Sequence, residues 1–246
     1  MRRVPPSERP ISPSDQAVAG GVAVPHHKGH RARLRQRFLQ AGPDSLADYE
    51  LLELVLFLAI PRRDVKPLAK DLLTRFGSLA GVLGADIPAL SAVDGLSETA
   101  AVALKTVHAA AVRVTREAVS DAPVLSGWQA LNDYVRTALA HEKREQFRVL
   151  FLDRKNRLIV DEAMATGTID RVAVYPREVV RRALELDASA VILVHNHPSG
   201  DPRPSKGDIA MTRMVSDACD KLDITVHDHL VVGRSGNASF KTLGLL

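Results

Sequence analysis

Residues 189–208 read SAVILVHNHPSGDPRPSKGD, and the stretch begins with an apolar run that ends in two histidines. A short apolar run of this kind is typical of a buried β-strand. Pro198 ends the strand, because proline has no N–H for a sheet hydrogen bond. The letters SKGD then follow the pattern of a helix start, in which Ser205 caps the helix and Asp208 reaches back from its third position. The stretch therefore predicts a strand, a turn and a helix.

The two histidines in this stretch have the spacing of a pair of metal ligands. His195 and His197 are two residues apart on a strand, so their side chains leave the same face about 6 to 7 Å apart. The glycine and proline bends that follow can bring Asp208 alongside. Two imidazoles and one carboxylate leave the fourth position of a zinc ion open to water, as in catalytic zinc sites. A polar strand end beside an ordinary helix cap explains the same residues, and the spacing leaves both interpretations open.

Strands and helices alternate on both sides of this stretch. Strands are expected at 146–153, 156–165, 189–197 and 224–233, helices at 130–142, 175–188 and 205–223, and a short final element within 236–246. Such alternation predicts an α/β or α+β fold. We assign residues 125–246 to this domain.

The first half of the chain has helical patterns throughout. Residues 1–28 are rich in Pro, Ser, Gly and Ala and are expected to be a flexible tail, in which His26 and His27 are an incidental pair. Helices are expected within 30–42, 45–60, 65–83, 87–93 and 95–119. The composition changes near SDAPVLSGW, which we interpret as a linker. An all-helical module is therefore expected over residues 29–120.

Charge and composition limit the classes of function. The net charge is +4: residues 1–120 hold 16 Lys and Arg against 12 Asp and Glu, and residues 121–246 hold 17 against 17. A basic excess in the helical half is compatible with an acidic partner such as nucleic acid, and also with a solvated basic face. No apolar run approaches the roughly 18 to 20 residues of a membrane helix. Polar residues follow the first arginines where a signal peptide would be apolar, so we expect a cytoplasmic protein.

The chain has one cysteine, Cys219, within a helical pattern. A single cysteine excludes an intramolecular disulfide and a multi-cysteine zinc cluster, so any metal must be held by His and carboxylate groups. We expect Cys219 to be a small buried residue.

The segment HNHPSGDPRPSKGD resembles the metal motif of the JAB/MPN metallopeptidases, in which His-x-His-Pro is followed by six residues, Ser, two residues and Asp. The chain matches every fixed position, with His195, His197, Pro198, Ser205 and Asp208. The longer string GTIDRVAVYPREVVRRALELDASAVILVHNHPSG is similar to the RadC branch of that family. The likeness extends back through HRARLRQRF, DYELLELVLFLAIPRRDVKPLAKDLL and RFGSL.

The resemblance implies a metallohydrolase domain with a mixed, cytidine-deaminase-like central sheet and one zinc ion. In this sequence His195, His197 and Asp208 would bind the zinc. An upstream glutamate would act as acid and base, with Glu145 as the best match. Ser205 would donate a hydrogen bond to the developing oxyanion. The implied substrate is an unidentified protein or peptide amide.

Some neighbouring positions leave alternatives open. Glu142 and Glu162 are rivals of Glu145 for the acid and base role. The better-known eukaryotic relatives have Ser or Thr where this chain has Asn196, which weakens any transfer of their isopeptide specificity. The segments around Thr166, Gly167 and Thr168 and around Tyr175 and Arg177 resemble RadC hallmarks whose chemistry the residues do not reveal.

A second pair, His227 and His229, has the same spacing as the first. It runs on into LVVG, without a proline turn and without a following aspartate. We therefore expect both residues to be ordinary members of a strand.

The helical half contains VDGLSETAAVALKTV, which resembles a helix-hairpin-helix element that presents backbone N–H groups to a DNA phosphate. Ser97 replaces the usual second glycine, and Asp94 and Glu98 bring negative charge, so a hairpin used for packing is the alternative. The better candidates for phosphate contacts are His30, Arg31, Arg33, Arg35, Arg37, Arg62, Arg63 and Lys66.

Three hypotheses follow from the sequence. The first is a zinc-dependent hydrolase of the metallopeptidase type. The second is a protein associated with DNA repair, whose basic helical module binds nucleic acid and whose metal domain is accessory. The third is an interaction module whose metal site no longer turns over.

Overall fold

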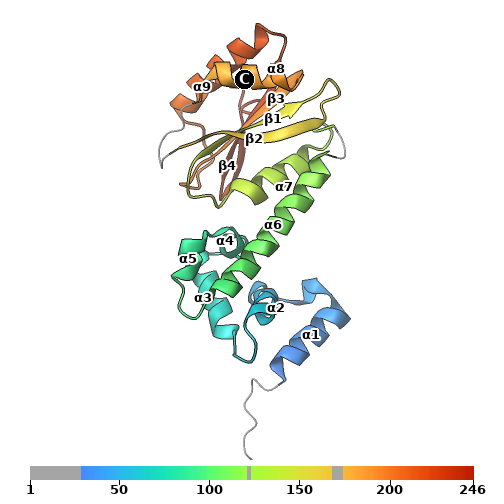
Figure 1. Ribbon diagram of the computed structural model, residues 1–246, viewed down its shortest axis with the longest axis vertical. Helices are drawn as coiled ribbons and strands as arrows, with labels where there is room; N and C mark the ends of the chain where they lie inside the picture. Colours follow the sequence, from blue (N-terminus) through green and yellow to red (C-terminus); the bar gives the residue numbers. More distant parts are fainter. Residues whose placement is uncertain (1–28, 121–122, 168–173) are drawn as a thin grey trace, which may run out of the picture.

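The computed structural model describes residues 29–120, 123–167 and 174–246 (Figure 1). The expected tail at 1–28, with His26 and His27, lies outside these ranges, as does Thr168. Within the described residues the chain forms a helical part followed by a part built on a β-sheet.

The helical part has the elements α1 (His30–Ala41), the short 3-10 turn η1 (Pro43–Ser45), α2 (Asp48–Ala59), α3 (Lys66–Phe76), α4 (Leu79–Gly84), α5 (Ile87–Ser91) and α6 (Glu98–Ser120). Leucine, valine and alanine side chains from α2 to α6 form one buried cluster. Leu52, Leu72 and Leu104, from α2, α3 and α6, are fully buried in it. Each helix thus buries one apolar stripe against the others.

The sheet part has α7 (Trp128–Leu139), β1 (Gln146–Leu152), β2 (Leu158–Thr166), α8 (Pro176–Glu185), β3 (Ala190–Asn196), α9 (Lys206–Asp220), β4 (Thr225–Gly233) and β5 (Gly236–Ser239). The strand order is β2-β1-β3-β4-β5. β3 and β4 are parallel, with α9 as the connection between them, and the other neighbours are antiparallel. The expected α+β arrangement with a mixed central sheet is confirmed.

Alternate side chains of β3 enter two different cores. Ile192 and Val194 pack on the face that α7 and the end of α6 cover, while Val191 and Leu193 pack on the face of α8 and α9. All seven residues of β3 are buried. This central strand therefore delivers the residues at its carboxyl end into the layer between the sheet and α9. Cys219 is fully buried in that layer, as expected.

Helix α6 belongs to both halves of the molecule. Leu104 lies in the core of the helical part, whereas Val112 and Val119 pack against the sheet part. The long helix therefore joins the two cores (Figure 1). The domain bounds at 120 and 125 stay a prediction.

The turn before α6 has features of the expected hairpin. Gly95 has a φ of +76°, a conformation that favours glycine, and the Ser97 hydroxyl accepts a hydrogen bond from the Ala100 N–H at 3.2 Å. Ser97 thus caps α6. The helix-hairpin-helix assignment and contact of this turn with a DNA phosphate both stay predictions.

Several of the basic residues considered for nucleic acid already have partners within the chain. The His30 ring lies 2.8 Å from the buried Glu53 carboxylate, Arg31 donates to two backbone carbonyls, and Arg37 forms an ion pair with Glu50. These three side chains hold α1 against the neighbouring helix and loop. No helix of the described residues is long and apolar enough to cross a membrane.

Candidate metal centre

The candidate ligands come from the end of β3 and the start of α9. His195 continues the row of Val191 and Leu193 on the sheet face that α9 covers. His197 lies just after the strand, and its N–H still donates to the Val232 carbonyl of β4 at 2.9 Å. The strand period therefore directs both rings toward the N-terminus of α9.

The start of α9 is the capping box that SKGD predicts. The Ser205 hydroxyl accepts a hydrogen bond from the Asp208 N–H at 3.1 Å, and the Asp208 Oδ2 accepts one from the Ser205 N–H at 2.6 Å. The predicted cap is confirmed. It also fixes the direction of the Asp208 carboxylate, so one side chain serves as helix cap and candidate ligand.

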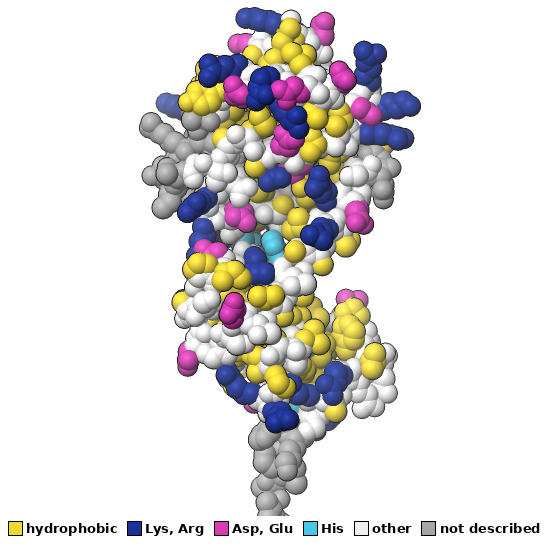
Figure 2. Space-filling view, viewed as in Figure 1, with side chains coloured by type: hydrophobic (Ala, Val, Ile, Leu, Met, Phe, Trp, Pro, Cys, Tyr) yellow, Lys and Arg dark blue, Asp and Glu magenta, His cyan; other side chains and the backbone are white. Residues whose placement is uncertain are grey.

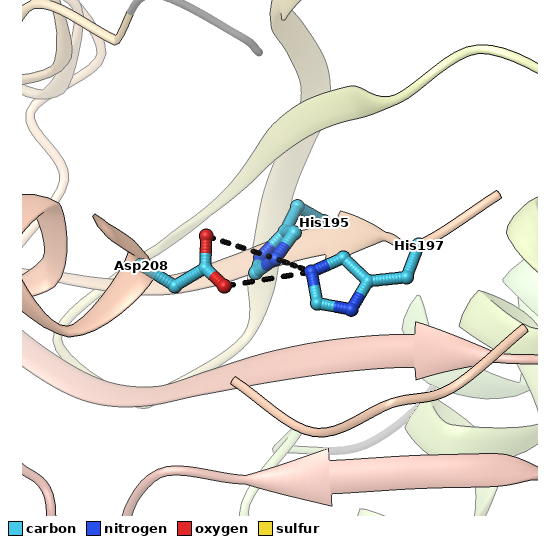
Figure 3. A group of neighbouring side chains, drawn as sticks. All are labelled: His195, His197 and Asp208. Carbon is cyan, nitrogen blue, oxygen red and sulfur yellow. Dashed lines mark hydrogen bonds and ion pairs between the residues drawn. The ribbon is translucent and has the colours of Figure 1, made fainter. Parts of the chain in front are cut away.

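The side chains of His195, His197 and Asp208 point toward one another (Figure 3). The two Nε2 atoms are 3.0 Å apart, His195 Nε2 lies 3.5 Å from Asp208 Oδ1, and His197 Nε2 lies 3.4 Å from Asp208 Oδ2. Zinc bonds to nitrogen and oxygen of about 2.0 to 2.2 Å in a tetrahedron require ligand atoms about 3.3 to 3.6 Å apart. The observed triangle is close to the face of such a tetrahedron.

The backbone fixes which nitrogen of His197 faces the triangle. His197 Nδ1 lies 2.8 Å from the Asp201 carbonyl oxygen. A carbonyl only accepts hydrogen bonds, so the proton of the neutral ring is on Nδ1. The lone pair of Nε2 is therefore directed toward His195 and Asp208.

A chain of buried hydrogen bonds fixes the tautomer of His195. The Thr212 hydroxyl lies 2.6 Å from the Asp208 backbone carbonyl and 2.6 Å from His229 Nδ1. Because the carbonyl has no proton, Thr212 donates to it and accepts from His229 Nδ1–H. His229 Nε2 then accepts from His195 Nδ1–H at 2.7 Å. The Nε2 lone pair of His195 is left to face the triangle.

Burial keeps this supporting histidine neutral. His229 is completely buried, stacks on the Phe240 ring at 4.5 Å between centroids, and meets the edge of Phe147. Burial, together with the neighbouring His195, lowers the pKa of His229 well below its usual value. A neutral ring has one proton, which agrees with the assignment to Nδ1.

Two imidazole lone pairs and a carboxylate thus converge, an arrangement that requires a cation between them. A hydrogen bond with Asp208 raises the pKa of His197. Burial opposes ionisation of Asp208, but hydrogen bonds from His195 and His197 outweigh it and hold its pKa well below the usual range. In the metal-free protein, a proton shared among these groups supplies the positive charge. In the metal-bound protein, the three groups match the set of ligands that zinc prefers.

Comparison with known proteins agrees with this geometry. Residues 125–245 match the RadC-like JAB domain, and residues 27–102 match the UPF0758 N-terminal domain. A UPF0758 protein from Rhodobacter capsulatus is 60% identical to this chain over 213 residues, which cover 87% of this chain and 100% of that relative.

The chain belongs to the RadC family. The described site lies entirely within its RadC-like JAB domain.

Three glutamates of the JAB domain were candidates for the acid and base, and they have different surroundings. Glu162 on β2 is held by the Arg182 guanidinium, which lowers its pKa. The Glu142 carboxylate accepts only a long bond of 3.4 Å from Gln146 among the contacts described for it. Glu145 is half-buried, and its negative charge adds to the raised pKa of His197 after the larger effect of Asp208. Of the three, Glu145 is the one whose charge is among the main causes of the raised pKa of His197.

Asn196 gives the segment before β1 its position. Its Oδ1 accepts from the Gln146 N–H at 2.9 Å, and its Nδ2 donates to the Arg144 carbonyl at 3.1 Å and to the Glu142 carbonyl at 3.3 Å. The residue between the two histidines thus holds the backbone on both sides of Glu145. In this JAB domain the asparagine therefore supports the segment that carries the candidate acid and base.

The other positions that attracted attention in the sequence lie at the surface or at a strand end. Tyr175 is 58% exposed, and the Arg177 guanidinium lies over its ring, 5.5 Å from the centroid. Both side chains face solvent rather than a buried site. Thr166 is the last residue of β2, and the Gly167 N–H donates to the Glu145 carbonyl at 2.9 Å.

Sequence reasoning missed the supporting roles of Thr212 and His229. His229 was expected to be an ordinary strand residue, and it does lie in β4. Its contact with His195 depends on the pairing of β3 with β4, in which Leu193 is opposite His229. The spacing of His227 and His229 in the sequence does not predict the contact between His229 and His195.

Proposed function

We propose that the chain is a zinc-dependent hydrolase of the metallopeptidase type, with a single ion held by His195, His197 and Asp208. The observation that carries the proposal is the convergence of two Nε2 atoms and one carboxylate at separations close to a tetrahedral face. The ligand side chains also differ in exposure: His195 is 1% exposed, His197 18% and Asp208 15%. A partly exposed ligand set is suited to a site that a substrate must reach.

When zinc is bound in such a site, it lowers the pKa of a water molecule and polarises a carbonyl group. Glu145 would take the proton of the attacking water and return it to the leaving amine, so one carboxylate serves both steps. Its half-buried position near His197 supports this role. The Asn196 contacts keep the Glu145 segment next to the end of β3.

Ser205 would stabilise the charge that develops on the carbonyl oxygen. Its hydroxyl accepts from the Asp208 N–H and so retains its own proton for donation. The residue is exposed at the start of α9, where the helix N-terminus also favours negative charge. Capping and oxyanion binding are therefore compatible.

Metal analysis of the purified protein tests the proposal. Wild-type protein is expected to contain about one zinc ion per chain, and the variant with both His195→Ala and His197→Ala is expected to contain almost none. His227→Ala is the matched control, because it removes a histidine of the neighbouring strand β4 whose hydrogen-bond partner is Asn156 rather than a residue of the triangle. Wild-type protein that takes up no zinc from solution would overturn the proposal.

Nucleic-acid binding by the helical part is a second candidate function. It is favoured by the exposed positions of Arg33, Arg35 and Arg37 along α1, although Arg37 is paired with Glu50. Contacts of this kind give affinity that falls steeply with salt and depends little on sequence. Titration of duplex DNA at two salt concentrations tests it, and absence of binding at low salt removes this candidate.

A further inference from the structure

A concave site separate from the metal triangle lies where the helical part meets the sheet part. It is a cavity of about 380 Å³, within the size range of small-molecule sites. Its walls come from α4, α6, the end of α7 and the turn between β4 and β5. Figure 2 shows basic and histidine side chains at the narrow waist between the two parts. The metal triangle is not among the described residues that line this cavity.

The polar residues of the cavity are mostly basic. His108, Arg136, His141 and Arg234 line it, against one acidic lining residue, Asp133. The Asp133 carboxylate already accepts a hydrogen bond from Gln129 at 2.9 Å. Thr137 also lines the cavity, and its hydroxyl donates to the Asp133 carbonyl at 2.7 Å. The remaining lining residues are apolar: Ala80, Leu83, Ala111 and Ala140.

These basic groups lie close enough to repel one another. Burial lowers the pKa of His141, and Arg234, His108 and Arg136 lower it further. Burial also lowers the pKa of His108, with Lys105 as the next cause and Glu142 as a weaker opposing charge. The neutral forms of both histidines are therefore favoured, and the two arginines are the cationic groups at this concave surface, where a bound anion would offset their charge.

Hydrogen-bond donors in the cavity remain available. Over the described ranges, no carboxylate forms an ion pair with the guanidinium of Arg136 or of Arg234. Arg234 uses one nitrogen to donate to the Ser199 carbonyl at 2.8 Å, and its other N–H groups are left for a ligand. Guanidinium groups bind phosphate through two parallel hydrogen bonds.

We propose that this cavity binds a small organic phosphate, a molecule the size of a mononucleotide, with its phosphate on Arg136 and Arg234 and its less polar body against the alanine and leucine wall. The concave shape, the limited volume and the apolar wall favour a small molecule over a duplex, whose convex backbone offers phosphates without a body to bury. The site is distinct from the metal centre and does not depend on the proposed hydrolase activity.

The cavity is connected to both segments that build the metal centre. The Arg234 guanidinium contacts Ser199 and packs on Gly200, in the loop between His197 and Asp208. His141 directly precedes Glu142, whose carbonyl accepts from Asn196. A ligand on Arg234 and His141 would therefore contact residues continuous with both segments.

Calorimetric titration of the metal-free full chain with inorganic phosphate and with adenosine monophosphate tests the proposal. Adenosine monophosphate is expected to bind saturably and more tightly than phosphate, because it also buries an apolar body. Arg136→Glu is expected to weaken both by about tenfold or more, since it replaces a charge-assisted donor by a repelling charge. Arg213→Glu, on the exposed side of α9, changes the net charge equally and is expected to leave both unchanged.

The same titrations include outcomes that overturn the proposal. These are an absence of saturable binding of either ligand, or equal weakening by Arg136→Glu and Arg213→Glu. Loss of binding in the His195→Ala, His197→Ala variant would assign the ligand to the metal centre instead. Duplex DNA binding that depends on Arg136 without binding of adenosine monophosphate would assign the surface to nucleic acid. Arg136→Gln, with circular dichroism of each variant, separates loss of the donor from loss of the fold.

Discussion

The two His-x-His pairs lie on neighbouring parallel strands, yet their side chains have different surroundings. His195 and His197 stand at the end of β3, where the chain turns into α9 and brings Asp208 to them. His227 and His229 lie within β4, where His227 contacts Asn156 and His229 is enclosed behind His195. The two pairs have the same spacing, but only the pair at the end of β3 has a third ligand group, Asp208, beside it. The second pair instead contributes one supporting residue.

Asp208 is the donor that the second pair lacks, so its removal should have the largest effect. Asp208→Ala is expected to lower zinc affinity by more than about a hundredfold. Loss of a residue that only supports a ligand lowers metal affinity by up to about a hundredfold, and loss of a ligand itself should cost more. It should also cost about 1 kcal/mol of stability, because the capping box is lost. Competition with a chromophoric chelator measures the affinity, and urea unfolding of the metal-free protein measures the stability.

Asp208→Asn separates these two effects. An asparagine oxygen can still accept from the Ser205 N–H, so the stability of the metal-free protein should stay close to wild type. The charge that attracts zinc is gone, so the metal affinity should still fall. Wild-type affinity in both variants would mean that the two histidines bind the metal without a third protein ligand.

Replacing His229 tests whether the second pair supports the first. His229→Phe fills the volume between Phe147 and Phe240 but leaves His195 Nδ1–H without an acceptor. Zinc affinity should fall by about 10- to 100-fold, as for other residues that orient a metal-binding histidine. His229→Gln places an oxygen near the position of Nε2 and should restore part of the affinity.

The spectrum of the cobalt-substituted protein gives a second measurement for these variants. If His229 orients His195, His229→Phe should distort the tetrahedral cobalt absorption, and His229→Gln should distort it less. An unchanged affinity and spectrum in His229→Phe would show that the hydrogen bond between the two rings is dispensable.

Thr212 contacts the ligand His195 only through His229, so replacing Thr212 should lower zinc affinity less than replacing His229. Thr212→Val keeps the shape of the side chain but removes the acceptor of His229 Nδ1–H and the donor to the Asp208 carbonyl. Zinc affinity should fall by about tenfold, and Thr212→Ser should retain it. Thr115→Val is the control, because the half-buried Thr115 hydroxyl on α6 likewise donates to the backbone carbonyl four residues earlier and contacts none of the three ligands. Equal losses in both valine variants would point to a general effect on helices.

Much of the site was predictable because its signals are local. The apolar run, Pro198 and SKGD each depend on a few consecutive residues, and they determined the strand, the turn and the capping box. The sheet order was not predictable in the same way, since it depends on the pairing of strands that are distant in sequence. The hydrogen-bond chain through Thr212 and His229 required that pairing and the packing of α9 as well. The position of Glu145 came from the family resemblance rather than from spacing.

The smallest effect should come from His227, the member of the second pair that points away from the metal. Its ring makes one hydrogen bond, with the Asn156 side chain at 2.6 Å, near the turn between β1 and β2. Burial lowers its pKa, so the neutral ring is favoured in the folded chain and His227→Ala removes no buried charge. The cost should be about 1 kcal/mol or less, the usual contribution of one partly buried hydrogen bond. Zinc affinity and the cobalt spectrum should match those of the wild type, because His227 contacts none of the three ligands. A loss of zinc affinity comparable to that of His229→Phe would mean that both histidines of the second pair support the metal-binding pair.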